Sequence, residues 1–305
     1  MPNFPAPVRE GVEDALARLG LSRKVREISP VTGGCINHGA RVDTGDGSFF
    51  LKWNASAPPR FFEAEADGLR ALGAPGVLKV PRPLAHGGGS GAPAWFLMEY
   101  LPAGRPSPLY EETLGRGLAA IHASGATHAT FGWSRKNWIG SLPQSNKEGP
   151  SWAAFWQTQR LAPQLRTARD HGFLGGPAGK VLDRVLELTP AALSDVDRGP
   201  PHLLHGDLWG GNAYPTTDGT PALIDPAVYL GHGEVDLAMT ELFGGFGTRF
   251  YHGYREAAGI SEAYGSYRRD LYQLYYLLVH VNLFGSQYER ASVTAATRVV
   301  TALSD

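Results

Sequence analysis

The chain has 305 residues, longer than a usual single domain, so two domains or two lobes that share an interface are expected. Apolar residues make up 43% of the sequence and charged residues 19%, which excludes a disordered chain and is typical of a globular protein. The formal net charge of −1 provides no overall positive field that would favour nucleic acid or an anionic membrane as a partner.

The first hundred residues predict a small antiparallel sheet with helices. We expect a helix over about 7–19 and then three strands within 26–53, separated by a Gly-rich turn at 32–37 and a hairpin turn at 44–47. In 60–73, apolar residues at helical spacing form one face, and Glu65 is the single carboxylate on it. Segments 77–87 and 94–101 complete a lobe of five strands with one main helix.

Helices are expected to dominate from about residue 107. Ser107 as N-cap, Pro108 as the first helical residue and Gly125 at the end predict the first of them. Short extended pieces interrupt the helices at 202–207, 213–217 and 221–227, and the apolar stretch 271–284 predicts a buried core helix. The fold class is therefore α+β, with an N-terminal lobe over 1–101 and a mostly helical C-terminal lobe over 102–305.

The lack of a recognisable secretory signal and the single cysteine predict a cytoplasmic protein. The N-terminal segment lacks a basic stretch followed by an apolar one, so it does not predict a secretory signal. The apolar stretch 271–284 is too short to span a bilayer. The single cysteine, Cys35, excludes an intramolecular disulfide and a multi-cysteine metal site, and the ten histidines show no zinc-ligand spacing.

The segment "HGDLWGGN" (205–212) carries the residues on which the functional hypothesis depends. Asp207 is followed five residues later by Asn212, and a further thirteen residues on, an apolar pair leads into Asp225. Phosphoryl transfer requires a carboxylate that orients and deprotonates the attacking hydroxyl, and oxygen ligands that hold Mg²⁺ against the nucleotide phosphates. We therefore predict Asp207 as the catalytic residue, and Asn212 and Asp225 as ligands of Mg²⁺ and contacts of ATP.

An ordinary structural role for these residues is the alternative. Gly-Asp and Gly-Asn are common turn dipeptides, so Asp207 and Asn212 could be turn formers only. The order His-x-Asp-x4-Asn, followed by an apolar pair that ends in Asp, matches the catalytic loop and the metal-binding Asp of protein kinases. A kinase is the preferred interpretation because the N-terminal lobe provides the complementary residues.

Lys52 lies on the third predicted strand, where a kinase keeps the lysine that contacts the α- and β-phosphates. A solvated surface lysine is the ordinary alternative. Glu65, on the apolar face of the next helix, is the expected partner of Lys52, because a buried carboxylate needs a counter-charge. Glu63 is the less suitable partner because its helical face is polar.

Two backbone segments complete the predicted nucleotide site. The Gly-rich turn can bring N–H groups onto phosphates, although Gly-Gly is also an ordinary hairpin signal and the full G-x-G-x-x-G pattern is absent. The end of the strand "FLMEYL" can offer backbone hydrogen bonds to adenine, although a plain core strand is the alternative. The predicted contacts of these two segments are Gly33, Gly34, Cys35, Asn37, Met98, Glu99 and Tyr100.

With these motifs in place, the chain resembles the fructosamine kinase family, or ketosamine 3-kinases, related to aminoglycoside and choline kinases. "HGDLWGGN" resembles that family's catalytic loop, with Trp209 as the distinctive residue, and 224–246 resembles its metal-site segment, in which Asp-Pro-Ala replaces Asp-Phe-Gly. Further similar segments are "GGCIN", "FFEAEADGL", "VPRPL", "NWIGSLPQSN" and "WAAFWQTQRLAPQL". The resemblance implies a protein-kinase-like fold and ATP-dependent phosphorylation of the 3-hydroxyl of a ketosamine, free or protein-bound, in deglycation repair.

Other hypotheses stay open, since fold does not fix function. The acceptor could be an aminoglycoside or another small amino alcohol, or the chain could be an inactive nucleotide-binding module. The aromatic residues Trp152, Phe155 and Trp156, together with Arg160, either wall the acceptor pocket or belong to the core.

Four further side chains have predicted roles near the site. Asp236 is expected either to hold the catalytic-loop backbone or to be a helix cap, and Glu234 could face the substrate amine. His205 is expected to brace the loop. Cys35 is either an inert loop residue or a reactive thiol that forms a redox-dependent homodimer.

Overall fold

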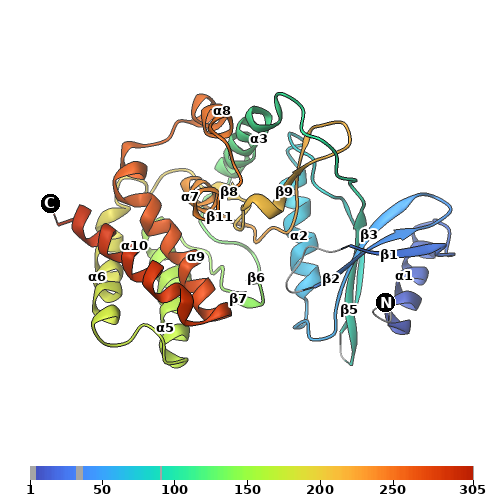
Figure 1. The fold of residues 1–305 in the computed structure, drawn as a ribbon, viewed down its shortest axis with the longest axis horizontal. Coiled ribbons are helices and arrows are strands. Elements are labelled where there is room, and N and C mark those ends of the chain that lie inside the picture. The colour runs from blue at the N-terminus through green and yellow to red at the C-terminus, as the bar shows by residue number, and fades with distance from the viewer. Residues whose placement is uncertain (1–4, 32–36, 90, 305) are drawn as a thin grey trace.

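The computed structural model describes residues 5–31, 37–89 and 91–304. The N-terminal part is a five-stranded antiparallel sheet with the strand order β1-β2-β3-β5-β4 (Figure 1). This confirms the predicted sheet, its meander and its hairpin turn at 44–47. The elements are α1 (Ala6–Arg18), β1 (Glu27–Val31), β2 (His38–Asp43), β3 (Ser48–Asn54), α2 (Phe61–Gly73), β4 (Pro83–Gly89) and β5 (Ala92–Glu99).

The two faces of this sheet are covered by different helices because side chains along a strand alternate between the faces. On β5, Trp95 and Leu97 pack in one cluster with the buried side of α1. Phe96 and Met98 point the other way and pack against α2, where they contact Phe62. Figure 1 shows that α2 lies between the sheet and the helical part of the molecule.

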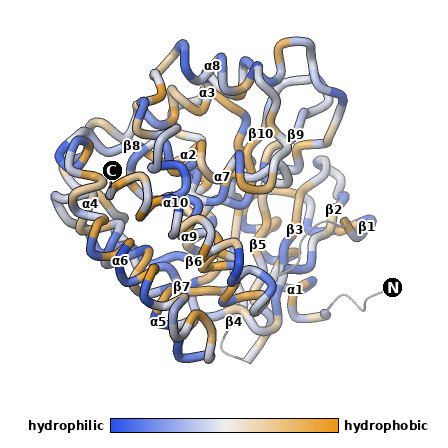
Figure 2. The backbone as a smooth tube through the Cα atoms, turned by 60° about the vertical axis from the view of Figure 1, so that its left-hand side comes forward, coloured by the Kyte–Doolittle hydropathy of each residue, from blue (hydrophilic) through white to orange (hydrophobic). Residues whose placement is uncertain are grey.

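The C-terminal part is mostly helical and includes pairs of very short strands. Its long helices are α3 (Tyr110–Ser124), α5 (Ala162–Asp170), α6 (Gly176–Ala192), α7 (Glu234–Leu242), α8 (Thr248–Ala258), α9 (Arg269–Phe284) and α10 (Glu289–Ala302). The shorter elements are β6 (Asn137–Ile139), β7 (Leu142–Gln144), α4 (Trp152–Phe155), a π-helical turn (Trp156–Leu161), β8 (His202–Leu204), β9 (Ala213–Pro215), β10 (Pro221–Leu223) and β11 (Tyr229–Gly231). Hydrophilic and hydrophobic segments alternate along helices such as α6 (Figure 2), as expected for helices with one buried face.

Two expectations about these elements can be compared with the structure, which also shows strand pairs that the sequence did not indicate. The predicted core helix is confirmed as α9, most of whose side chains are buried. The expected N-cap at Ser107 is wrong, because α3 begins at Tyr110 without a side-chain cap. Ser107 instead opens a turn, in which its carbonyl accepts a hydrogen bond from the N–H of Tyr110 (3.1 Å). The pairs β6–β7 and β11–β8 were not fully anticipated, because three-residue strands leave too little periodicity to recognise.

The two parts of the chain are joined around residue 100 and also touch elsewhere. Lys79, between α2 and β4, forms a parallel bridge with Ala222 of β10, and its ammonium lies 2.6 Å from Asp218. None of the helices in the described ranges is long and apolar enough to cross a membrane.

Candidate active site

The loop between β8 and β9 is built on a buried carboxylate. Asp236, in the first turn of α7, is fully buried and accepts hydrogen bonds from the N–H groups of His205 (2.7 Å) and Gly206 (2.9 Å). Burial alone would raise the pKa of Asp236, but the hydrogen bonds from His122 and from the N–H of Gly206 hold it below its usual value. The prediction that Asp236 holds the backbone of the loop is therefore confirmed.

Two side chains that sequence reasoning missed support Asp236. His122 Nε2 lies 3.1 Å from the carboxylate of Asp236, and His122 Nδ1 lies 2.8 Å from the hydroxyl of Tyr254. Because the carboxylate can only accept, Nε2 carries the proton that is donated to Asp236. The available signal was a polar residue on the apolar face of α3, which lacked an identified partner in the sequence.

His205 braces the loop, as expected. Its Nε2 donates to the carbonyl of Ile224 (2.8 Å), so its Nδ1 is the acceptor for the N–H of Asp207 (3.2 Å). This fully buried ring joins the loop that carries Asp207 to the segment that carries Asp225, and burial lowers its pKa, which favours the neutral form.

Glycine is required at position 206 of this loop, and the ring of Trp209 lies against Gly211. Gly206 has a φ of +81°, and a Cβ atom there would lie 2.2 Å from the carbonyl oxygen of Ala227. A Cβ on Gly211 would lie 2.2 Å from the ring of Trp209, which folds back over the loop and is 40% exposed. Gly206 thus allows a backbone conformation and a close approach to Ala227 that a side chain would prevent.

The structure brings Asp207, Asn212 and Asp225 together. The amide nitrogen of Asn212 donates to the backbone carbonyl of Asp207 (2.8 Å) and lies 3.4 Å from its carboxylate and 3.5 Å from the carbonyl of Asp225. Burial, together with the negative charges of Asp225 and Asp236, raises the pKa of Asp207 to about 7. Asp207 is thus a carboxylate that can exchange a proton near neutral pH.

Asp225 occupies a backbone conformation that non-glycine residues rarely adopt, with a φ of +56°. Its side chain is 43% exposed and forms an ion pair with Lys52. Lys52 is buried on β3 and also contacts Glu65 of α2 (2.5 Å). Burial alone lowers the pKa of Lys52, but the charges of Asp225 and Glu65 outweigh it and hold the pKa above its usual value. The predicted pairing of Lys52 with Glu65 is confirmed.

The donor set at Asn212 and Asp225 fits a hard divalent cation. Because the amide nitrogen of Asn212 is used by the loop, its oxygen is the atom that remains, and no other described residue donates to it. Asp225 lies beside Asn212, and its carboxylate is partly exposed. An amide oxygen and a carboxylate are ligands that Mg²⁺ prefers.

The polar face of α2 contacts the C-terminal part of the molecule. Glu63 accepts a hydrogen bond from Arg135 (2.9 Å), and Asp67 accepts one from the indole nitrogen of Trp133 (2.9 Å). Glu63 also pairs with Arg60 and is not a partner of Lys52, as expected. These contacts fix α2, and with it Glu65, relative to the loops that carry Asp207 and Asp225.

The remaining predicted nucleotide contacts have different positions. Met98 is buried against α2, Glu99 is exposed at the end of β5, and Tyr100 is half-buried. The carbonyl of Leu101 accepts a hydrogen bond from Tyr214 (2.9 Å), which ties the connection between the lobes to β9. The side chain of Asn37 accepts a hydrogen bond from Asn54 (3.0 Å).

Part of the predicted phosphate loop, Gly33, Gly34 and Cys35, lies outside the described residues. The redox-dependent homodimer through Cys35, one of the two alternatives for this residue, has no support from the described structure or from the comparisons below.

The structure decides two questions about the acceptor side that the sequence left open. Glu234 does not face a substrate: it is nearly buried and binds the backbone and hydroxyl of Ser261 and the guanidinium of Arg268 (3.1 Å). The aromatic residues at 152–156 and Arg160 are core residues, each at most 3% exposed. Their stripe packs against tyrosines of α9 and against Tyr229, a partner that helical spacing could not identify.

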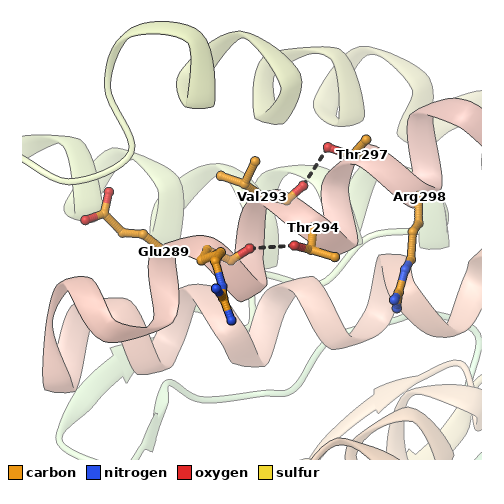
Figure 3. A pocket seen from close by; sticks show the side chains of 6 residues that line it. Glu289, Val293, Thr294, Thr297 and Arg298 are labelled. Atoms are coloured by element: carbon orange, nitrogen blue, oxygen red, sulfur yellow. Dashed lines mark hydrogen bonds between the residues drawn. The ribbon is translucent and has the colours of Figure 1, made fainter.

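A separate shallow cavity of about 410 Å³ lies on α10 (Figure 3), which Figure 1 places at the end of the molecule away from the sheet. Thr294 and Thr297 project into it, but their hydroxyls donate to carbonyls of their own helix (both 2.8 Å). The cavity therefore offers no converging set of free polar groups, and we assign it no function. Its lining residues are Glu289, Arg290, Val293, Thr294, Thr297 and Arg298.

A family model and the sequences of known proteins indicate the same family for this chain. A model of the fructosamine kinase family matches residues 12–302. A probable ketoamine kinase of Synechocystis is 41% identical over 290 residues, which cover 94% of this chain and 95% of the relative. The chloroplastic protein-ribulosamine 3-kinase of Arabidopsis thaliana is 38% identical over 94% of this chain and 86% of the relative.

Comparison with solved structures agrees with this result. A putative fructosamine-3-kinase from Thermobifida fusca superposes with a TM-score of 0.83 at 33% identity, covering 97% of this chain and 99% of the other. The aminoglycoside phosphotransferase APH(4)-Ia superposes with a TM-score of 0.60 at 16% identity, covering 97% and 99% of the two chains, which shows a shared kinase-like fold alone.

Proposed function

Because this chain belongs to the fructosamine kinase family and is an ATP-dependent phosphotransferase, we propose that it phosphorylates the 3-hydroxyl of the sugar of a ketosamine. A ketosamine is an amine to which glycation has attached a sugar. The printed names of the relatives, ketoamine kinase and ribulosamine 3-kinase, support this acceptor class. Ketosamines on proteins are included, so the cellular role is repair of glycated amines in the cytoplasm.

One observation carries the chemistry of this proposal: Asp207 lies beside Asn212 and Asp225, and Asp225 contacts the buried Lys52–Glu65 pair. Asp207, whose pKa of about 7 suits proton exchange, orients the acceptor hydroxyl and takes its proton. Asn212 and Asp225 hold Mg²⁺, which supplies positive charge against the phosphates of ATP. Lys52, fixed by Glu65, binds the phosphates.

The two lobes divide these tasks. Residues 1–101 form the nucleotide lobe, with 32–37 covering the phosphates and Met98, Glu99 and Tyr100 beside the adenine. Residues 102–305 form the catalytic and acceptor lobe. The contacts of Arg135 and Trp133 with α2 support a site in which the two lobes are held in a fixed position relative to each other.

The test is an ATP-consumption assay with a panel of acceptors. Synthetic ribulosamine and fructosamine derivatives of a blocked lysine are the expected substrates, and ³¹P NMR should place the phosphate on O3 of the sugar. An aminoglycoside, choline and the blocked lysine without sugar are the controls. Phosphorylation of an aminoglycoside or choline instead would identify a different acceptor class, and nucleotide binding without turnover on any acceptor would indicate an inactive module. The Asp207→Asn variant controls for contaminating kinases.

A further inference from the structure

Arg160 is a buried cation to which the proposed site assigns no role. It is 0% exposed and lies within the π-helical turn Trp156–Leu161, and within the described ranges its hydrogen bonds go only to uncharged amide and carbonyl oxygens. Burying an uncompensated charge is costly. π-helical turns are rare in proteins, and those that occur often lie at functional sites. Its charge is balanced by rings: the guanidinium carbon lies 3.9 Å from the ring centre of Tyr229 and 4.6 Å from that of Phe155.

Arg160 donates one hydrogen bond to the carbonyl of the adjacent Gln159 (3.1 Å) and two to the segment after β7. One terminal nitrogen donates to the carbonyl of Ser145 (2.6 Å) and the other to the side-chain oxygen of Asn146 (2.7 Å). Asn146 is 2% exposed, and its amide nitrogen donates to the side-chain oxygen of Asn137 on β6 (2.8 Å). The guanidinium therefore fixes which way round the amide of Asn146 is held.

The β6–β7 hairpin connects Asn146 by hydrogen bonds to the segment that follows Asp225. Gln144 also donates to the oxygen of Asn137 (2.8 Å), so that oxygen accepts twice and the nitrogen of Asn137 must face the other way. That nitrogen donates to the carbonyl of Val228 (2.8 Å), and Gln144 donates to the carbonyl of Ala227 (3.3 Å). Each of these amides is buried, so each bond lies in a low dielectric where an unmade bond is expensive.

The carbonyls of Ala227 and Val228 lie immediately after the turn that carries Asp225. Asp225 has a positive φ, and a non-glycine residue keeps this backbone conformation only where the surrounding structure holds it. On the upstream side, Ile224 is held by Asn212 and His205. On the downstream side, Pro226 has no N–H, so the turn is held by the N–H of Ala227, which donates to the carbonyl of His205, and by the two hairpin amides.

We propose that Arg160 is a positioning residue for the phosphoryl-transfer site. Through Asn146, Asn137 and Gln144 it fixes the backbone that follows Asp225, and so sets the direction in which the carboxylate of Asp225 is presented to the metal. The proposal rests on the proposed role of Asp225 as a metal ligand. It assigns a function to the hairpin at 137–144, which touches none of the reacting groups itself.

The test measures how much Mg²⁺ is needed to tighten the binding of a fluorescent ADP analogue to the full chain. Arg160→Met and Gln144→Met should raise the half-maximal Mg²⁺ concentration about tenfold, the usual effect of removing an outer-shell partner of a metal ligand. Binding of the analogue without Mg²⁺ should stay unchanged. Arg160→Lys, which keeps the charge but not the two-pronged geometry, should lie between wild type and Arg160→Met.

Trp152→Phe is the matched control for stability. It removes the buried hydrogen bond to Tyr272 (3.0 Å) in the same core but lies outside the amide network. If Arg160→Lys and Gln144→Met lower the melting temperature as Trp152→Phe does and leave the Mg²⁺ midpoint unchanged, Arg160 is merely structural and the proposal is wrong. If Asp225→Ala also retains the Mg²⁺ dependence of wild type, the proposed metal site itself fails, which separates the two outcomes.

Discussion

Asp207 combines a reactive pKa with a position that is poorly suited to a charge. Burial is the main reason that its pKa rises to about 7, and the neighbouring carboxylates Asp225 and Asp236 add to the shift. Asp236 stays ionised because three donors surround it, whereas the carboxylate of Asp207 accepts one long hydrogen bond, from Asn212 (3.4 Å), among the described residues. Two carboxylates of one loop system are thereby given different roles by their surroundings.

Replacing Asp207 should separate chemistry from binding. Asp207→Asn keeps the size of the side chain but cannot accept the hydroxyl proton, so kcat should fall by about 10²- to 10⁴-fold while ADP affinity stays near wild type. In wild type, kcat/KM should rise with pH through about 7, as the free enzyme's Asp207 ionises. Steady-state kinetics across pH check both expectations. A pH-independent kcat/KM in this range would argue against Asp207 as the base.

The same substitution should stabilise the folded chain at alkaline pH. Because the folded-state pKa of Asp207 lies above its unfolded value, ionisation costs folding free energy, fully above about pH 7 and not at all below about pH 4. Asp207→Asn should therefore raise the free energy of unfolding at pH 8 by on the order of a few kcal/mol. Urea unfolding at pH 8 and at lower pH provides the measurement, and a gain that does not shrink towards pH 4 would contradict this explanation.

At the scale of the element, α2 links the lobes through its two faces. Its buried face presents Glu65 to Lys52, and its polar face meets Arg135 and Trp133 from the other lobe. In this arrangement α2 holds Glu65 against Lys52. The helical periodicity predicted one apolar and one polar face for α2. The structure shows that each face contacts a different lobe.

Loosening the polar face of α2 should weaken nucleotide binding more than turnover. The double substitution Trp133→Phe and Arg135→Ala removes the contacts with Asp67 and Glu63. Partly exposed contacts of this kind contribute up to about 1 kcal/mol each, so ADP affinity should fall a few-fold with kcat nearly unchanged. Hydrogen exchange of α2 should increase. Arg9→Ala, which breaks an exposed pair with Glu13 on α1, is the matched control and should change neither quantity.

At the scale of the whole molecule, the site uses groups from both lobes, so nucleotide and metal should stabilise the chain as a unit. With Mg·ADP at about 100 times its Kd, the free energy of unfolding should rise by about 2.7 kcal/mol. Asp225→Ala should lose the Mg²⁺-dependent part of this gain, because Asp225 is the proposed link between the metal and the loop.

Thermal unfolding with ADP in the presence of Mg²⁺ or EDTA measures this gain. Asp218→Ala breaks another contact between the lobes, the exposed pair with Lys79, and should keep the full Mg²⁺-dependent shift. Equal shifts in Asp225→Ala and Asp218→Ala would contradict the assignment of Asp225.

The sequence by itself determined what depends on neighbours along the chain. Alternation and turn residues predicted the antiparallel sheet, helical spacing placed Glu65 on the apolar face of α2, and the intervals among Asp207, Asn212 and Asp225 indicated phosphoryl transfer. Hydrogen bonds between near residues follow regular geometry, so local patterns are sufficient for such predictions.

Only the tertiary structure decided which surface covers which. Periodicity shows that a face is apolar but not what packs on it, so the stripe at 152–156 belongs to the core and Glu234 binds Ser261 rather than a substrate. His122 meets Asp236 across 114 residues of sequence, and Arg160 reaches the turn of Asp225 through a hairpin. Such pairings are set by packing of the whole chain, because a buried polar group must find its partner wherever the fold brings one.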